Sequence, residues 1–220
     1  MRAQLRATPT SSMYLAAPPA AQILRHCFAF HLEIESRTHL VFINAMPSLE
    51  TARLILRPFR ENDVDLMAEL MANPDFMRFS LGVYSRQQTA AFVEKVIGWQ
   101  RDGLPSQFAL ITRSNGTLVG YCGFFHHEVD KRAEIEIGYR LRPAHWNRGL
   151  ATEAAQAVRN HAFRELKLPR VISLIHLDNI PSRRVAEKNG MKLEKETVFR
   201  GFPTLVFALS REEWSQNSAA

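Results

Sequence analysis

The sequence predicts an α+β fold, a mixed layer of strands and helices, and three observations support this prediction. Two apolar runs, residues 108–112 and 118–125, flank a Ser-Asn-Gly turn, which is the signature of a β-hairpin. A strand, an amphipathic helix and a nearly all-apolar strand follow within residues 133–177, which indicates one parallel crossover. A second hairpin closes the chain. Hairpins combined with one crossover are typical of a mixed sheet covered by helices.

The first half of the domain is predicted from its apolar periodicity. An alternating run at residues 52–59 predicts the first strand. Apolar residues at helical spacing between positions 64 and 71 predict a helix, which an Asn-Pro dipeptide closes. A second helix is expected from Ser85, as its N-cap, to Arg101, with Gly103 as its stop.

The second half follows the same logic after the first hairpin. The expected elements are a strand at 133–141, a helix at 149–166, a strand at 171–177, a helix at 180–189 ended by Gly190, and strands at 195–199 and 204–209. The predicted order is therefore β-α-α-β-β-β-α-β-α-β-β, without internal repeats after Met46.

The first 45 residues differ in composition from the rest, and we expect a dispensable extension there. Residues 1–30 contain several Arg, no Asp or Glu, and a Pro-Pro break. A transit-type presequence, a disordered arm and translation from an upstream start codon are the three alternatives, and Met46 favours the last. The domain is expected to span residues 46–220.

Composition and charge limit the classes of binding partner that we expect. The formal charge is +6, but basic and acidic residues are intermixed, so nucleic acid is not an expected partner. The excess charge suits an anionic small molecule or a solvated basic surface. Cys27 and Cys122 form no metal-ligand or disulfide pattern, and no apolar run approaches the roughly 20 residues that span a bilayer. We therefore expect a cytoplasmic protein without a membrane or metal partner.

The segment WNRGLATEA, Trp146–Ala154, stands between a predicted strand and a predicted helix. A helix N-terminus presents unpaired N–H groups and the positive end of the macrodipole, which favours anions. Gly149 and Ala151 keep the backbone accessible, Thr152 adds a hydroxyl and Arg148 a charge. The alternative is a turn that merely begins a helix.

This segment resembles the acetyl-CoA pyrophosphate loop of the GNAT acyltransferase superfamily, Q/R-x-x-G-x-G/A, although Trp146 replaces its first residue. ETARLILRPF, IEIGYRLRP and HLDNIPSRRVAEKNGMK resemble three further family motifs in the same order. The chain is most similar to the ribosomal-protein N-terminal alanine acetyltransferase (RimJ/RimL-like) branch. The resemblance covers residues 49–214.

The resemblance implies a sheet splayed between its fourth and fifth strands, at a bulge supplied by Gly138 or residues 140–143, and acetyl-CoA as co-substrate. The backbone N–H of Leu141 would then contact the thioester carbonyl. The implied cofactor-binding residues are Leu141, Trp146, Asn147, Arg148, Gly149, Leu150, Ala151, Thr152 and Asn179. Asn179 would contact the pantetheine arm, in addition to its expected role as a helix N-cap.

The implied chemistry needs a proton acceptor and a leaving-group acid. Glu134 and Glu136 share one strand face, and Glu136 is expected to act as the base through a water, because a partly desolvated carboxylate is more basic. The alternative is that Glu136 is a solvent-facing strand glutamate with cross-strand salt pairing. The resemblance implies Ser182 near the sulfur as proton donor to the leaving thiolate. Many relatives carry a tyrosine one helical turn later, and residues 185–187 contain none. His126 and His127 point to opposite faces of a strand, which disfavours a shared metal.

The predicted function is N-acetyl transfer from acetyl-CoA to a primary amine by direct attack. The acceptor is a protein N-terminus or a small-molecule amine, and its loops are expected at residues 73–85 and 199–204. A CoA-binding sensor without turnover is the alternative function. The protein is expected to be a monomer or a homodimer.

Overall fold

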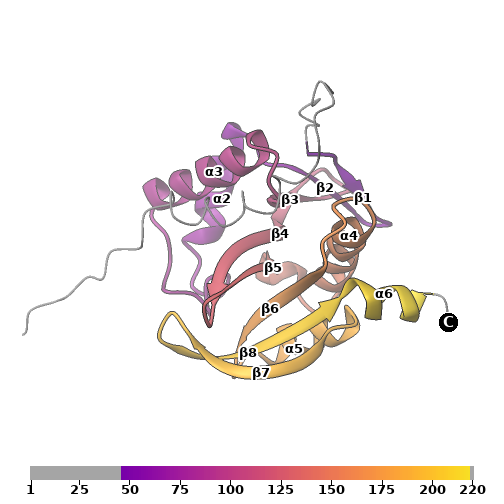
Figure 1. The fold of residues 1–220 in the computed structure, drawn as a ribbon. Helices are drawn as coiled ribbons and strands as arrows, with labels where there is room; N and C mark the ends of the chain where they lie inside the picture. Colours follow the sequence, from indigo (N-terminus) through magenta and orange to yellow (C-terminus); the bar gives the residue numbers. More distant parts are fainter. Residues whose placement is uncertain (1–45, 219–220) are drawn as a thin grey trace, which may run out of the picture. The chain divides into compact units, whose positions relative to one another are not determined.

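The computed structural model describes residues 46–218, so the predicted extension of residues 1–45 lies outside the described residues. Eight strands form one sheet in the order β1-β2-β3-β4-β5-β6-β8-β7 (Figure 1). The strands are β1 (Leu49–Glu50), β2 (Leu54–Pro58), β3 (Gln107–Thr112), β4 (Leu118–Val129), β5 (Arg132–Leu141), β6 (Arg170–His176), β7 (Lys192–Phe199) and β8 (Phe202–Ser210). All neighbours are antiparallel except β5 and β6, which are parallel. The predicted mixed α+β sheet is confirmed.

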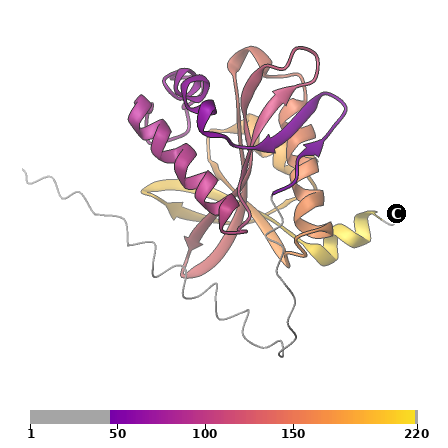
Figure 2. The same cartoon turned by 90° about the horizontal axis from the view of Figure 1, so that it is seen from above.

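Helices cover both faces of this sheet. Helices α2 (Val64–Met71) and α3 (Arg86–Arg101) lie on one side, and α4 (Leu150–Arg164) lies on the other (Figure 2). Helix α5 (Ile180–Lys188) joins the α4 side through its buried Ala186. Alternation along β3 separates the two cores, because Phe108 packs with α4 residues and Ala109 with α2 and α3.

Sequence periodicity placed every expected element, and the predicted N-cap of α3 is confirmed. The Ser85 hydroxyl accepts a hydrogen bond from Gln88 N–H, and the Gln88 side chain accepts one from Ser85 N–H. This reciprocal pair is a capping box.

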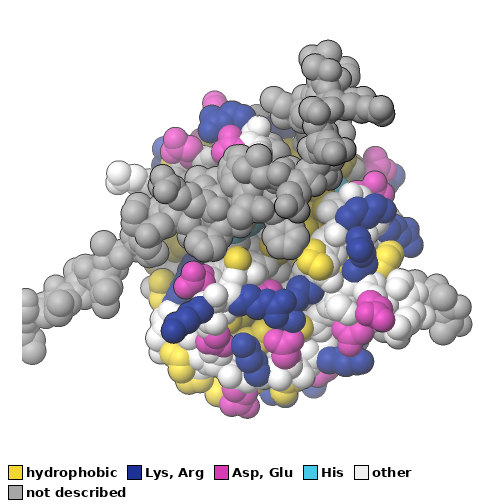
Figure 3. Space-filling model, viewed as in Figure 1, with side chains coloured by type: hydrophobic (Ala, Val, Ile, Leu, Met, Phe, Trp, Pro, Cys, Tyr) yellow, Lys and Arg dark blue, Asp and Glu magenta, His cyan; other side chains and the backbone are white. Residues whose placement is uncertain are grey.

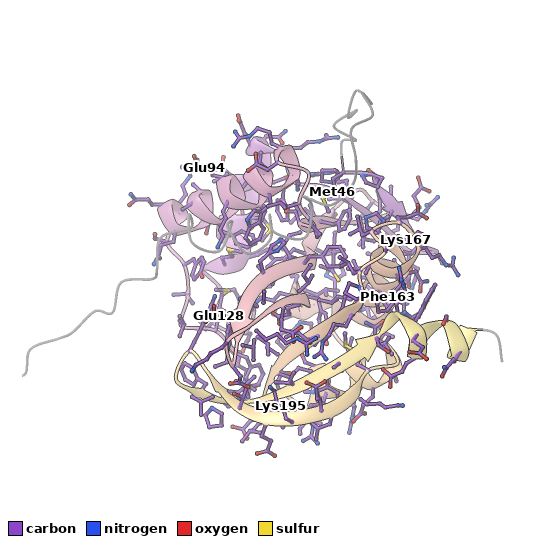
Figure 4. All side chains as sticks on the ribbon, in the orientation of Figure 1. Met46, Glu94, Glu128, Phe163, Lys167 and Lys195 are labelled. Atoms are coloured by element: carbon purple, nitrogen blue, oxygen red, sulfur yellow. The ribbon has the colours of Figure 1, made fainter. Side chains whose placement is uncertain are left out.

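Two elements were not expected from the sequence. Strand β1 has two residues, too few to show a period. Helix α6 (Arg211–Ser218) follows β8 and has no amphipathic pattern. Its Trp214 ring packs against Phe163, which lies near the end of α4 and is labelled in Figure 4, with 5.4 Å between the ring centroids.

The predicted opening of the sheet is confirmed, but the bulge lies in another strand. Within the described chain, β5 and β6 share one register pair, Glu136 with Ile172. Pairing of β5 with β4 runs without a shift from Arg132 to Leu141, so Gly138 forms no bulge there.

The shift occurs instead in β4, where Leu110 pairs with Gly120 but Ile111 pairs with Leu118. Gly120 has φ of +152°, and a Cβ at this position would lie 2.0 Å from the Arg140 carbonyl oxygen. Only glycine allows β4 to lie this close to β5, which explains why the bulge lies at a glycine of β4.

Charged side chains of both signs mix on the face that carries β7 and β8 (Figure 3). Three ion pairs cross this region: Arg170–Glu194, Lys195–Asp130 and Lys192–Glu213. Among residues 46–218, no helix is both long and apolar enough to cross a membrane, and no three or more His, Cys, Asp or Glu side chains converge on a potential metal position.

Candidate active site

The candidate site begins where β5 and β6 separate. Beyond the Glu136–Ile172 pair, side chains replace the missing backbone hydrogen bonds between the two strands. The buried Ser173 hydroxyl donates to the Ile137 carbonyl oxygen over 2.8 Å, and Leu174 N–H donates to Glu136 Oε1 over 3.3 Å. These bonds satisfy polar groups that the opened ladder would otherwise leave unpaired.

Glu136 also pairs with a histidine from the neighbouring strand. Its Oε2 lies 2.7 Å from His127 Nε2, and the two side chains are only 13% and 11% exposed. The His127 ring packs against Phe125 and Phe199, with centroid separations of 5.9 Å and 5.0 Å. A carboxylate and an imidazole in hydrogen-bond contact can hold and exchange a proton.

The sequence prediction missed this contact of His127, which it considered only as a metal ligand. The register could have revealed it. Asp130 and Lys131 form the two-residue turn between β4 and β5 with φ of 48° and 64°, and Val129 pairs with Arg132. Counting back from that pair places Phe125 opposite Glu136 and His127 diagonally across from it.

Glu134 shares the strand face with Glu136 but has a different environment. It is 7% exposed, and each of its carboxylate oxygens lies 3.2 Å from an arginine, Arg132 for one and Arg170 for the other. Glu134 is therefore held by salt bridges to two arginines. Glu136 remains the carboxylate in the opening.

The loop before α4 has the backbone of an anion site. Gly149 is the N-cap of α4 in the left-handed region, with φ of 76° and no side-chain cap. Leu150 anchors the first turn in the core, while Gly149 itself is exposed. The first-turn N–H groups of α4 therefore begin at a residue without a side chain.

An ion-pair network that the sequence prediction did not include holds this loop in place. Arg53 Nη1 donates to the Arg148 carbonyl oxygen over 2.7 Å, and Arg53 also pairs with Glu153 in the first turn of α4. The Thr51 hydroxyl donates to Glu153 over 2.6 Å. Partial burial raises the pKa of Glu153, but the bonds from Thr51 and Arg53 outweigh it and lower the pKa overall.

Basic residues lie close to His145 in the loop. Burial first, and then the charges of Arg148 and Arg142, lower the pKa of His145. A histidine whose protonation is opposed by two arginines marks a place that favours anions. Among the expected cofactor residues, Trp146 has a structural contact as well, because its indole N–H donates to the Leu141 carbonyl oxygen over 2.7 Å.

The backbone N–H of Leu141 points toward the opening. Arg142 N–H donates to the Val119 carbonyl oxygen over 2.7 Å, which places Arg142 in a hydrogen-bonded position of the β4–β5 ladder. Antiparallel positions alternate, so Leu141 presents its N–H on the opposite side, from which β6 has diverged. This orientation suits the expected contact with a thioester carbonyl.

Asn179 and Ser182 lie at the start of α5. The Asn179 side chain accepts a hydrogen bond from Ser182 N–H over 3.2 Å, so the expected N-cap is confirmed. Tyr139 from β5 donates its hydroxyl to the Ser182 carbonyl oxygen over 3.0 Å, and burial raises the pKa of that hydroxyl. Tyr139 thus joins β5 to α5 across the opening.

The two expected acceptor loops meet at the end of β6. The His176 ring lies 5.6 Å from Phe79 of the first loop and 6.2 Å from Phe202 of the second, between ring centroids. Arg140 anchors the first loop, since its guanidinium donates to the Phe76 and Phe79 carbonyl oxygens over 2.9 Å and 3.2 Å.

Comparison with known proteins identifies similar chains. Residues 53–192 match the model of the acetyltransferase (GNAT) domain family. The uncharacterised N-acetyltransferase YnaD of Bacillus subtilis is 31% identical over 76% of this chain and 99% of its own. The crystal structure of a GNAT-family acetyltransferase from Bacillus anthracis has a TM-score of 0.65 at 30% identity, over 76% of this chain and 99% of its own. The ribosomal-protein-serine acetyltransferase of Escherichia coli is 29% identical over 64% of this chain and 80% of its own.

Proposed function

The chain belongs to the GNAT family of acetyl-CoA-dependent acyltransferases, and we propose that it transfers the acetyl group to a primary amine by direct attack. The observation that carries this proposal is the Glu136–His127 pair in the opening between β5 and β6. The pair lies on a sheet whose next loop, before α4, has the features of an anion site. A proton acceptor and a cofactor loop are the two parts that this transfer requires.

The loop before α4 would bind the pyrophosphate. The first-turn N–H groups of Leu150, Ala151 and Thr152 would donate to its oxygens, with Arg148 and Asn147 at the rim. Asn179 would contact the pantetheine arm. Leu141 N–H would stabilise the negative charge that develops on the thioester oxygen.

The amine nitrogen would attack the thioester carbon, and the carbon–sulfur bond would break as the thiolate leaves. The amine proton would pass to the Glu136–His127 pair through a water. If His127 donates from Nε2 to Glu136, its Nδ1 is an acceptor, so the pair can accept the proton at either residue. Ser182 would pass a proton to the thiolate and take up one from solvent water.

We assign the chain to the RimJ/RimL-like branch, whose acceptors are protein N-termini. Similarity to the ribosomal-protein-serine acetyltransferase of Escherichia coli supports this assignment. The relevant experiment measures thiol release from acetyl-CoA with a panel of N-terminal peptides and small amines. Turnover with peptides above all small amines is the expected result. Turnover with small amines alone would contradict the assignment to this branch. Tight CoA binding without turnover of any amine would instead support the alternative function, a CoA-binding module.

A further inference from the structure

A line of aromatic rings leads from the proposed proton acceptor to the tip of the β7–β8 hairpin. The His127 ring, which is hydrogen-bonded to Glu136, lies 5.0 Å from the Phe199 ring between centroids. Phe199 and Phe202 are paired directly across the tip of the hairpin, so their side chains share one face. The second expected acceptor loop therefore brings one ring into contact with the Glu136–His127 pair and places a second ring next to the first.

A second route from Glu136 to the same rings runs along β6. Leu174 N–H donates to Glu136 Oε1, and His176 lies two residues farther along β6, on the same strand face and about 7 Å away. The His176 ring lies 6.2 Å from Phe202 and 5.6 Å from Phe79 of the first acceptor loop, between centroids. Phe79, His176 and Phe202 thus form a ring cluster at which both routes from Glu136 meet.

The ring cluster is fixed in position but partly open to solvent. Phe202 is 44% exposed although it is a large apolar residue, and the side chain of His176 is 30% exposed. Phe79 is anchored through its backbone, because the Arg140 guanidinium donates to its carbonyl oxygen over 3.2 Å. A ligand that covers such a surface is stabilised by the apolar area that it removes from water. The cluster is therefore suited to an apolar group.

The charged groups at the cluster are weaker determinants of what binds there. Arg78 Cζ lies 5.7 Å from the Phe79 centroid, and Arg200 Cζ lies 5.1 Å from the Phe199 centroid. Both arginines are exposed, and the side chain of Asp178 beside the cluster is 86% exposed. Solvent and salt weaken the interactions of exposed charges, whereas contact between apolar surfaces is not screened.

We infer that the acceptor carries an apolar group close to its amine, and that this group packs on the ring cluster while the amine reaches Glu136. The inference rests on the proposed function and specifies its substrate class. A peptide N-terminus whose first residue is apolar has this chemistry, and so has a small alkylamine. Phe79 and Phe202 then determine specificity, because they come from the two loops expected to bind the acceptor.

The test compares acceptors that are matched in shape. Leu, Asn and Asp side chains are nearly isosteric, so thiol release at saturating acetyl-CoA is measured with the tripeptide amides Leu-Ala-Ala, Asn-Ala-Ala and Asp-Ala-Ala. Isopentylamine and β-alanine amide form the corresponding pair of small amines. We expect kcat/KM at least about tenfold higher for the Leu peptide than for the Asn peptide, because burial of the isobutyl group is favourable. Turnover of the peptide pair or of the small-amine pair identifies the source of the apolar group.

Variants of the two phenylalanines then locate the subsite. Phe202→Ala and Phe79→Ala should each lower the Leu/Asn ratio at least about threefold, while KM for acetyl-CoA changes little. Phe202→Leu keeps an apolar side chain and should keep most of the ratio. Val198→Ala is the matched control, because Val198 is 70% exposed on the same hairpin but lies on the strand face opposite to Phe199. It should keep the wild-type ratio.

A wild-type ratio of one, a preference for the Asp peptide, or a ratio that neither alanine variant changes would overturn the inference while the enzyme still turns over. Chemical denaturation checks that the variants fold, and the exposed Phe202 decides if Phe79→Ala does not. No thiol release with any amine would instead refute the proposed function. Calorimetric binding of the Leu and Asn peptides to the CoA complex then decides the inference, and equal affinities would overturn it.

Discussion

Glu136 and His127 lie on adjacent strands with 2.7 Å between Oε2 and Nε2, at the point where β5 loses its pairing with β6. Leu174 N–H holds the other carboxylate oxygen. The carboxylate is thus fixed by both neighbouring strands, by a side chain of β4 and by the backbone of β6. This arrangement makes the pair the main target for mutation.

Glu136→Gln should lower kcat by about 10²–10⁴-fold, because it removes the proton acceptor while keeping the shape of the side chain. KM for acetyl-CoA should change little, since the cofactor loop lies elsewhere, and the acidic limb of the pH–rate profile should disappear. Glu134→Gln is the matched control on the same strand face. It should keep kcat and instead lower the free energy of unfolding by about 1–3 kcal/mol, because Arg170 loses a buried partner. Small and equal losses of kcat in both variants would exclude Glu136 as the base.

The pair should behave as one unit in a double-mutant cycle. His127→Gln should lower kcat, and the double variant with Glu136→Gln should be little slower than Glu136→Gln alone, because both changes disable the same proton acceptor. Steady-state kinetics of the four proteins measure this coupling. Strictly multiplicative losses would show that His127 and Glu136 act independently.

Gly149→Asp should weaken acetyl-CoA binding by at least about tenfold, or roughly 1.4 kcal/mol, because it places a negative charge at the N-cap of α4. Gly149→Asn has nearly the same shape and also tolerates the left-handed conformation at φ of 76°, so it isolates the charge from the strain. We expect a smaller loss for Asn. Calorimetry giving equal affinities for the wild type and Gly149→Asp would refute the phosphate assignment.

His145 should report cofactor binding through its titration. In the free protein, burial and the charges of Arg148 and Arg142 lower its pKa. Bound phosphates would offset the arginine charges, so the pKa of His145 should rise when CoA binds. The affinity for CoA should then increase as the pH falls through the range between the pKa of His145 in the complex and its pKa in the free protein. Proton NMR of the imidazole with and without CoA measures the shift. The His145→Gln variant is the control, because any pH dependence of its CoA affinity comes from other groups, such as the phosphates of CoA. A pKa of His145 that is unchanged or lowered by CoA would contradict a phosphate at this loop.

Gly120→Ala should destabilise the fold by more than about 3 kcal/mol, because its Cβ would lie 2.0 Å from the Arg140 carbonyl oxygen in a position that side chains rarely adopt. Gly116→Ala is the control. Gly116 has φ of 68° but no atom within 4 Å of the added Cβ, so only the conformational cost of about 1–2 kcal/mol applies. Chemical denaturation of both variants measures the free energy of unfolding. Equal decreases in the two variants would show that β5 moves away from the added Cβ at little energetic cost.

Local features of the sequence were sufficient to predict all strands and helices except β1 and α6, and the glycine at which α4 begins. Periods of two and of 3.6 residues located the strands and helices, Ser85 marked the start of α3, and Gly149 marked the start of α4. These signals depend on neighbours within one or two turns of chain. Helix α6 escaped prediction for the same reason, since its apolar contact through Trp214 with Phe163 comes from a single position and has no period.

Only the tertiary structure decided which side chains meet. The strand pattern places Glu134 and Glu136 on the same face and could not distinguish their roles, because their partners come from other strands. Arg170 binds Glu134, and His127 and Leu174 bind Glu136. The expected β5 bulge was wrong for a related reason, because the distortion arose from contact between two strands at Gly120. Strand register and close approach are properties of pairs of segments, and the pattern within a single segment does not specify its partner.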